Sequence, residues 1–326
     1  MAGTVGGLRI LLVVNSFASS VTARNTVVVH RRLSRHHDVE LVETNRRGHA
    51  TRFAADAARR GLDVVVGFGG DGTLNEVATG IAGTETALGV LPGGSTNVFA
   101  RTIGLPNDPV AAVELLADGL DSADLRPIGL GQVNGRFFCF HTGVGFDAAV
   151  VAAVERHASW KRWVGHPMFI GAALTTWARG YDRSRPHFRV VTGDGAVEGF
   201  FSIILNTNPY TYLANRPLDL SHAATFDRGL VAVTFRTMKA LAIVRSLIGA
   251  LRGGGVRPSK SVDEQVDLHE FVIEAGEHGT PFPYQVDGDY LGEVTRLEFR
   301  HVPDAVRLVF PGGTAPEPAG VGAESG

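Results

Sequence analysis

The sequence contains almost no cysteine. Cys139 is the only cysteine among the 326 residues, which excludes an internal disulfide framework and a zinc site built from several cysteines. A single cysteine fits a reducing compartment, and we interpret Cys139 as a small buried thiol on an apolar strand. The twelve histidines show no paired metal-ligand spacing, so the sequence predicts no zinc site.

Long apolar runs and an excess of charge of one sign are also missing. No apolar stretch approaches the roughly 18 to 20 residues that a bilayer span needs. The run at residues 10–14 is too short for the apolar part of a signal peptide and is typical of a buried strand. The 31 basic and 33 acidic residues leave a net charge of -2, which argues against a nucleic-acid partner.

These absences indicate a cytoplasmic protein. If the protein contacts a membrane, we expect it to bind peripherally at the inner face of that membrane. The sequence leaves the oligomeric state open, a homodimer included.

The first third of the chain alternates short apolar runs with helical patterns. This alternation predicts a parallel sheet wrapped by helices, a doubly wound α/β domain over residues 1–125. The expected strands cover residues 10–14, 39–42, 63–68 and 87–91. The expected helices cover residues 22–37, with Thr22 as the cap, and 50–60, 73–81, 96–102 and 109–117.

After Leu125 the sequence changes to longer β-like runs with hairpin-like turns. Such runs predict a second, largely antiparallel domain over residues 126–301. Helical inserts are expected near residues 146–157, 166–179 and 241–251. Residues 312–326 are rich in Gly, Pro and Ala and are predicted to be a disordered tail.

The most informative stretch is the glycine loop that runs from Gly69 to Asn75. It follows the apolar strand at residues 64–66 and opens a helix, which is the geometry that a phosphate needs. A carboxylate at Asp71 fits such a loop if it holds Mg²⁺ or accepts a proton from an attacking hydroxyl. The alternative is a tight strand-to-helix turn in which Asp71 caps the helix. The loop matches neither the Gly-Lys-Ser/Thr phosphate loop nor the dinucleotide glycine pattern.

A second glycine loop covers residues 91–97 and follows the next strand. Its Ser95 and Thr96 can cap the following helix or donate hydrogen bonds to phosphate. Two glycine loops at the carboxyl ends of neighbouring strands define one crevice, which is where open α/β sheets bind ligands.

These two loops closely resemble the signature of the diacylglycerol kinase catalytic domain family, which includes bacterial lipid kinases and sphingosine kinases. The resemblance implies a Rossmann-like ATP-binding domain completed by residues 302–311 and a β-sandwich-like lipid-substrate domain. It also implies nucleotide contacts at Asn15, Ser16, Thr44, Gly69, Gly70, Asp71, Gly72, Thr73, Leu74, Asn75 and Ser95.

Near the end of the chain, Val286-Asp287-Gly288-Asp289 resembles the family's Asp-Gly-Glu motif. The resemblance makes Asp289 the general base toward the lipid hydroxyl. From the chemistry alone either Asp71 or Asp289 can accept the proton. An Asp-Gly pair between β-runs is also an ordinary hairpin turn.

The sequence departs from the family pattern at several positions. Val98 and Arg228 stand where bacterial diacylglycerol kinases have two acids of an accessory magnesium network, so we expect only the nucleotide-linked Mg²⁺ near Asp71. Ser16 stands where a proline is common, and His141 stands where Asn is usual. We treat His141 as structural.

Residues 160–163 and 166–170 mix aromatic and basic side chains in the way that interfacial segments do. The alternative is that these side chains pack into the core of the second domain.

The sequence therefore predicts an ATP- and Mg²⁺-dependent kinase of phospholipid biosynthesis that converts diacylglycerol to phosphatidic acid. Three alternatives remain open: a sphingoid-base or glycolipid kinase, an NAD kinase, and a catalytically inactive nucleotide- or lipid-binding regulator.

Overall fold

The structure is a computed structural model that describes residues 7–155, 171, 173–213 and 215–312. Its contacts divide the chain into two compact units. The first unit comprises Met1–Ile128 and Asp304–Gly326, and the second comprises Gly129–Pro303. Strands β5 (Leu125–Val133) and β18 (Arg296–Val309) each contribute residues to both units.

The first unit is built on a parallel sheet. Its strands lie in the order β2-β1-β3-β4-β18, and every neighbouring pair in this order is parallel. The prediction of a parallel sheet wrapped by helices is confirmed. The elements are β1 (Arg9–Val14), α1 (Ala23–Leu33), β2 (Asp38–Glu43), α2 (His49–Arg59), β3 (Val64–Gly69), α3 (Asp71–Ile81), β4 (Ala87–Pro92), α4 (Val98–Thr102), α5 (Pro109–Asp121) and the last part of β18.

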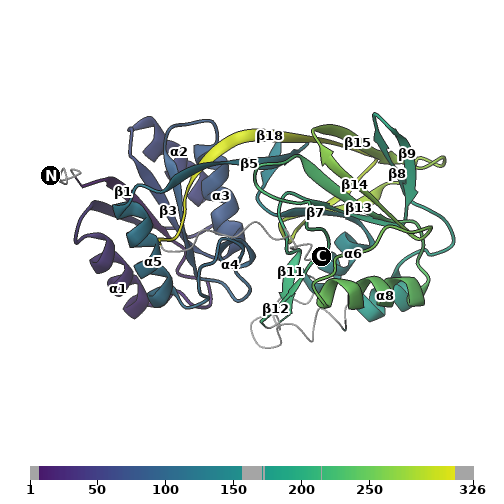
Figure 1. Ribbon diagram of the computed structural model, residues 1–326, viewed down its shortest axis with the longest axis horizontal. Coiled ribbons are helices and arrows are strands. Elements are labelled where there is room, and N and C mark those ends of the chain that lie inside the picture. Colours follow the sequence, from purple (N-terminus) through teal and green to yellow (C-terminus); the bar gives the residue numbers. More distant parts are fainter. Residues whose placement is uncertain (1–6, 156–170, 172, 214, 313–326) are drawn as a thin grey trace, which may run out of the picture. The chain divides into compact units, whose positions relative to one another are not determined.

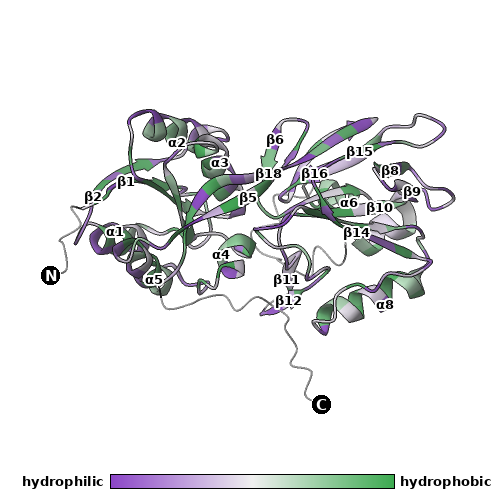
Figure 2. Ribbon diagram, turned by 45° about the horizontal axis from the view of Figure 1, so that its top comes forward, coloured by the Kyte–Doolittle hydropathy of each residue, from purple (hydrophilic) through white to green (hydrophobic). Residues whose placement is uncertain are grey.

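Strands β3 and β4 are buried along their whole length, as is β1 beyond its first residue. Helices α2 and α3 cover one face of the sheet, and α1 and α5 cover the other (Figures 1 and 2). Because helices cover both faces of the sheet, the sequences of these strands are continuous apolar runs and do not alternate between apolar and polar residues. The edge strand β2 has only exposed and partly buried residues.

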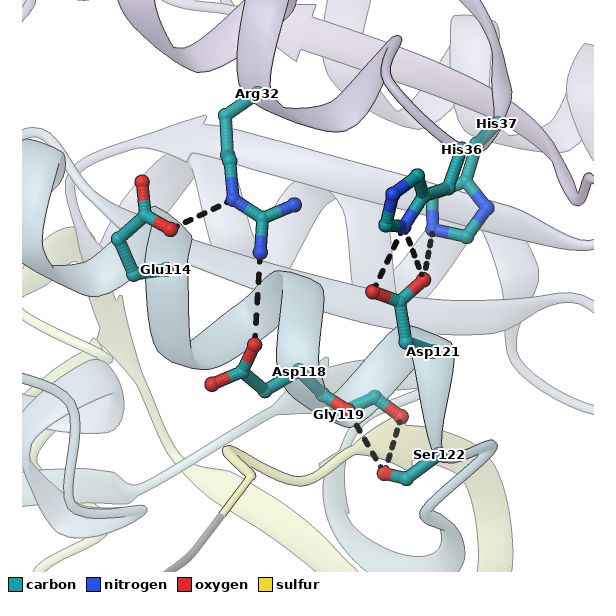
Figure 3. Close-up of polar contacts among 8 residues, drawn as sticks. All are labelled: Arg32, His36, His37, Glu114, Asp118, Gly119, Asp121 and Ser122. Carbon is teal, nitrogen blue, oxygen red and sulfur yellow. Dashed lines mark hydrogen bonds and ion pairs between the residues drawn. The ribbon is translucent and has the colours of Figure 1, made fainter.

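Helix α1 begins as predicted, because Thr22 accepts a hydrogen bond from the backbone N–H of Asn25. The predicted end near His37 is wrong, since the helix ends at Leu33. The two histidines that follow lie against Asp121 of α5, with His36 Nδ1 2.9 Å from its carboxylate (Figure 3). This contact holds the chain at the turn into β2.

Besides the two-stranded sheet β11-β12, the second unit contains two larger antiparallel sheets. One has the order β14-β13-β10-β7-β16-β17, and the other joins β18, β15, β8 and β9, with β5 and β6 attached. The prediction of a largely antiparallel second part is confirmed. The elements are β6 (Arg136–Phe138), β7 (His141–Gly145), α6 (Phe146–Glu155), the π-helix η1 (Thr176–Gly180), β8 (Phe188–Thr192), β9 (Gly195–Gly199), β10 (Phe201–Leu205), β11 (Thr211–Leu213), β12 (Arg216–Leu218), β13 (Leu230–Phe235), α8 (Ala240–Leu251), β14 (Val262–Leu268), β15 (Glu270–Ala275), β16 (Phe282–Val286) and β17 (Asp289–Val294).

The two larger antiparallel sheets share one apolar core. Phe188 of β8 contacts Phe282 of β16, with ring centroids 5.4 Å apart, and so joins the sheets. Within one sheet, Phe271 and Phe299 stack at 4.8 Å. Aromatic pairs of this kind stabilise a core beyond the area that they bury.

Two of the predicted segments lie outside the described residues. They are residues 156–170, which include the aromatic and basic stretch, and residues 313–326 of the predicted tail. Among the helices that are described, none has both the length and the apolar character that crossing a membrane requires.

Candidate active site

Four loops of the first unit leave the sheet at the same edge. Asn15 follows β1, Thr44 follows β2, Gly70 follows β3 and Gly93 follows β4. Because these strands are parallel, their carboxyl ends meet at one edge, and open α/β sheets bind ligands there. The predicted nucleotide contacts lie in these loops or in the first turns of α3, where the side chains of Thr73, Leu74 and Asn75 are buried.

Hydrogen bonds tie the loops together. The backbone N–H of Asn15 donates to Phe68 O at 2.9 Å, and its side-chain Nδ2 donates to Thr73 Oγ1 at 2.9 Å. The N–H of Gly93 donates to Gly69 O at 2.7 Å, and Ser20 N donates to Gly93 O at 2.8 Å. The loop geometry is thus fixed by the protein's own bonds.

Close packing between the loops explains most of the glycines. A Cβ at Gly69 would lie 2.5 Å from Thr73 Oγ1, and one at Gly93 would lie 2.7 Å from the Cα of Gly69. Such contacts are too short, so these positions must lack a side chain. Gly72 is different, because it is exposed and a Cβ there would meet nothing within 4 Å.

The open space beside Gly72 lies at the N-terminus of α3. Gly70 is the N-cap and supplies no side-chain hydrogen bond, and Asp71 and Gly72 form the first turn. The first N–H groups of a helix have no acceptor within the helix, and the helix dipole is positive at that end. The N–H of Thr73 already donates to Gly70 O at 2.9 Å, so this end of α3 offers the N–H of Gly72 beside room for an anion.

Asp71 acts as a helix cap, but for a helix other than its own. Its Oδ2 accepts the N–H of Val98 and its Oδ1 accepts the N–H of Phe99, both at 3.0 Å, at the start of α4. Burial raises the pKa of the Asp71 carboxyl, and the two backbone hydrogen bonds act in the opposite direction. The carboxylate thereby joins the two glycine loops.

The expected start of α4 near Thr96 is wrong. The helix begins at Val98 after Asn97, which has a left-handed φ of 49°. Neither Ser95 nor Thr96 is its cap, because Asp71 already accepts the N–H groups that such a cap would satisfy. Ser95 is exposed at the tip of the loop.

Glu76 is a residue of this site that the sequence analysis missed. Its Oε1 accepts the N–H of Gly48 at 2.8 Å and its Oε2 accepts the N–H of Ala50 at 3.0 Å, at the start of α2. No local pattern signals this role, because the partners are more than 25 residues away in the sequence. Glu76 fixes the loop that follows Thr44.

In the second unit, Asp287 and Gly288 form the turn between β16 and β17, with φ values of 47° and 85°. The hairpin interpretation of this motif is confirmed. The buried Asp287 carboxylate accepts three backbone N–H groups, from Cys139 at 2.7 Å, Phe140 at 3.1 Å and His141 at 3.0 Å. Asp287 is thus committed to holding the segment before β7.

Asp289 follows this turn as the first residue of β17 and is partly exposed. Its Oδ2 lies 3.4 Å from Arg136 Nη2. Asp289 and Arg136 belong to the second unit, whereas Asp71 and the glycine loops belong to the first.

A buried polar network supports the turn before Asp289. Gln285 accepts the N–H of Gly288 at 2.8 Å and donates from Nε2 to Asp147 Oδ2 at 2.9 Å. The hydroxyl of Tyr210 donates to Asp147 Oδ1 at 2.5 Å. Burial raises the pKa of the Asp147 carboxyl. The sequence analysis missed Gln285 and Tyr210, because their partner lies more than 60 residues away in the sequence.

Gly143 makes this network possible. A Cβ at Gly143 would lie 1.6 Å from Asp147 Oδ2, so any side chain there would displace the carboxylate. The glycines of the stretch at residues 143–147 are therefore the one sequence signal that points to the network.

His141 is buried beside Tyr210, with ring centroids 4.5 Å apart. Burial lowers the pKa of His141 from 6.5 to about 3. The unfolded chain binds this proton below about pH 6.5 and the folded protein does not, so the stabilisation is present above that pH and is lost as the pH falls toward 3.

We expect acid to destabilise the protein partly through His141. Between about pH 7.5 and pH 5 the loss is about 2 kcal/mol in the free energy of unfolding, at roughly 1.4 kcal/mol per pH unit below 6.5. His141→Asn should remove this share of the pH dependence. Urea unfolding of both proteins at the two pH values measures it, and an equal pH dependence in both would show that His141 is not the group responsible.

The parallel sheet and the loops at its carboxyl edge place the first unit in the class of open α/β domains, which bind ligands at that edge. A family model, the diacylglycerol kinase catalytic domain, matches residues 9–133. A Pseudomonas aeruginosa (strain PAO1) protein named "Probable lipid kinase YegS-like" is 30% identical over 269 residues, which is 82% of this chain and 83% of that protein. The chain therefore belongs to the diacylglycerol kinase catalytic domain family, and this membership supports a lipid kinase activity.

Two other similarities agree with this assignment. The diacylglycerol kinase of Bacillus subtilis (strain 168) is 43% identical over 100 residues, which is 30% of this chain and 32% of that protein. A crystal structure of a diacylglycerol kinase from Bacillus anthracis superposes with a TM-score of 0.68 at 18% identity, covering 94% of this chain and 98% of that one. At 18% identity, the similarity to the Bacillus anthracis structure shows a shared fold alone.

Proposed function

We propose that this protein is an ATP-dependent lipid kinase that transfers the γ-phosphate of ATP to a lipid hydroxyl, with diacylglycerol as the substrate. The observation that carries the proposal is the open space beside Gly72 at the start of α3. No packing contact requires a glycine there, and the positive end of the helix dipole, with the N–H of Gly72, is suited to an anion. A phosphate group of ATP fits both properties.

The loops at the sheet edge have separate roles in this proposal. The N-terminus of α3, with the N–H of Gly72, binds the phosphates, and Ser95 at the tip of the second loop donates a further hydrogen bond. Asn15 orients Thr73 through their hydrogen bond. Asp71 and Glu76 fix the starts of α4 and α2, so the donors stay in place as charge develops on the phosphates.

Asp71 is the residue of this edge that would hold Mg²⁺. In protein sites Mg²⁺ typically binds one or two carboxylates together with substrate phosphates and water, and the Asp71 carboxylate has about four acceptor sites, more than its backbone hydrogen bonds use. Bound there, Mg²⁺ neutralises charge on the phosphates. Within the described parts of the chain, no group of three or more His, Cys, Asp or Glu side chains forms a separate metal cluster.

The lipid hydroxyl needs a proton acceptor as it attacks the phosphate. Asp71 is one candidate, because its carboxylate lies at the start of α3, beside the space that we assign to a phosphate. Asp289 offers a second carboxylate, which is held at the end of the turn that Gln285 and Gly288 fix. Both remain candidates for the base.

We expect labelled γ-phosphate from ATP and Mg²⁺ to appear in diacylglycerol when a panel of detergent-dispersed diacylglycerol, sphingoid base, glycolipid and soluble NAD is assayed. Asp71→Asn should lower the rate by about a hundredfold or more, because it removes a charge at the phosphates. Asp56→Asn, at an exposed position on α2, is the matched control and should keep the wild-type rate. Folded protein that binds ATP but labels no member of the panel would contradict the proposal.

A further inference from the structure

Helix α8 exposes an unusual apolar surface. Leu241 is 72% exposed, Val244 48%, Leu247 42% and Ile248 41%. At 100° per residue these four side chains fall within an arc of about 120°. Ile243 and Ala250 lie outside this arc and pack in a second apolar cluster of the unit, which is separate from the core between the two sheets. In Figure 2 much of the α8 ribbon has the green colour of hydrophobic residues.

The charged residues of the sequence segment that contains this helix have one sign, although Asp219, from outside the segment, lies near Gly253 at the end of the helix. Between Asp227 and Asp263 the sequence has no acidic residue, although the chain as a whole has a net charge of -2. All the basic residues of this stretch are exposed, and in the part of the chain that the structure describes none of them forms an ion pair. They are Arg228, Arg236, Lys239, Arg245, Arg252, Arg257 and Lys260.

Two of these cations border the apolar surface. Arg245 and Arg252 are seven residues apart and therefore lie along the same edge of the four apolar side chains. Long basic side chains beside an apolar helix face extend their charged groups toward lipid headgroups while the apolar residues enter the acyl region. Helix α8 has this arrangement.

An anionic lipid surface fits this face better than a second copy of the chain does. Two copies that met through α8 would bring two acid-free basic segments together, and like charges at an interface oppose association. Anionic headgroups attract Lys and Arg, and the membrane boundary accepts aliphatic side chains. Both properties of the surface are then satisfied by one occupant.

We infer that α8 docks the protein on an anionic lipid bilayer, with Leu241, Val244, Leu247 and Ile248 inserted and the flanking cations on the headgroups. The inference rests on the proposed function only in that a kinase for a membrane lipid must reach the bilayer. The binding itself needs no catalysis.

Binding of the full chain to vesicles tests the inference. We expect the protein to sediment with vesicles that contain phosphatidylglycerol and to bind pure phosphatidylcholine weakly. The double variant Leu241→Asp/Val244→Asp should bind about tenfold more weakly or worse, because it places charge in the inserted face. Val27→Asp is the matched control on α1, where Val27 is 53% exposed, and it should bind as the wild type does. Thermal unfolding checks that each variant is folded.

Kinase assays separate this inference from the proposed function. The double variant should phosphorylate detergent-dispersed lipid at the wild-type rate and lipid in vesicles more slowly. Vesicle binding that depends on α8 in a protein without kinase activity would support the docking surface and contradict the proposed function. If kinase activity is normal and the double variant binds vesicles as the wild type does, the docking surface is overturned. A dimer in solution that the two substitutions dissociate would also overturn it.

Discussion

The Asp289→Asn protein is expected to be as stable as the wild type but to have a kcat that is lower by about a hundredfold to ten-thousandfold, if Asp289 is the general base. Its contact with Arg136 is long and partly exposed, and such pairs contribute about 0 to 1 kcal/mol to stability. Steady-state kinetics on dispersed lipid and urea unfolding give the two quantities.

Asp287→Asn is the matched variant, with the same chemical change two residues earlier. Asn tolerates the left-handed φ of 47° at this position. Its amide has one oxygen in place of two, so either the N–H of Cys139 or those of Phe140 and His141 lose their partner. A buried donor left unpaired costs about 1 to 3 kcal/mol.

The two variants should therefore affect different quantities. Asp287→Asn is expected to lower the free energy of unfolding and to change kcat less than Asp289→Asn does. A wild-type kcat for Asp289→Asn, together with a large loss for Asp71→Asn, would assign the base to Asp71. An unchanged unfolding curve for Asp287→Asn would show that its carboxylate does not hold the segment before β7.

Gly72→Ala is expected to separate stability from ATP binding. The new Cβ meets no protein atom within 4 Å, and Ala in a helix is favoured over Gly by roughly 0.5 to 1 kcal/mol. The variant should unfold at the same or a higher urea concentration. The Cβ would also occupy the space that we assign to a phosphate, so the Kd for ATP should rise about tenfold or more. Calorimetric titration with ATP and Mg²⁺ measures this change.

Gly193→Ala is the control for this experiment, because a Cβ at the exposed Gly193 also meets nothing within 4 Å but the residue lies in a turn of the second unit. It should leave ATP affinity unchanged. Gly69→Ala should behave in the opposite way and destabilise the protein, since its Cβ would overlap Thr73. Unchanged ATP affinity in Gly72→Ala would remove the observation that carries the proposed function.

The capping role of Asp71 affects how its variants are interpreted. In Asp71→Asn the amide group replaces one acceptor, so either Val98 or Phe99 loses a hydrogen bond and α4 begins less stably. Activity should therefore be compared at a temperature where unfolding curves show that both proteins are folded. Loss of activity under that condition reports on the phosphates and the metal, not on folding.

The sequence by itself determined the parallel sheet, the place of the glycine loops and the Asp287-Gly288 hairpin. Each follows from local rules: apolar runs mark buried strands, carboxyl ends of parallel strands meet at one edge, and Asp-Gly suits a tight turn. The capping of α1 by Thr22 follows from an equally local rule, because its partner Asn25 is three residues away.

Only the tertiary structure decided how the acidic residues are used. Asp71 caps α4, Glu76 caps α2, and Asp287 is buried on backbone N–H groups while Asp289 stays accessible. The tertiary structure also showed that Gly72 lies beside open space, whereas a side chain at Gly69 would overlap Thr73. The reason is physical: a carboxylate satisfies whichever donors the packed chain brings to it, and donors distant in the sequence are brought together only by packing.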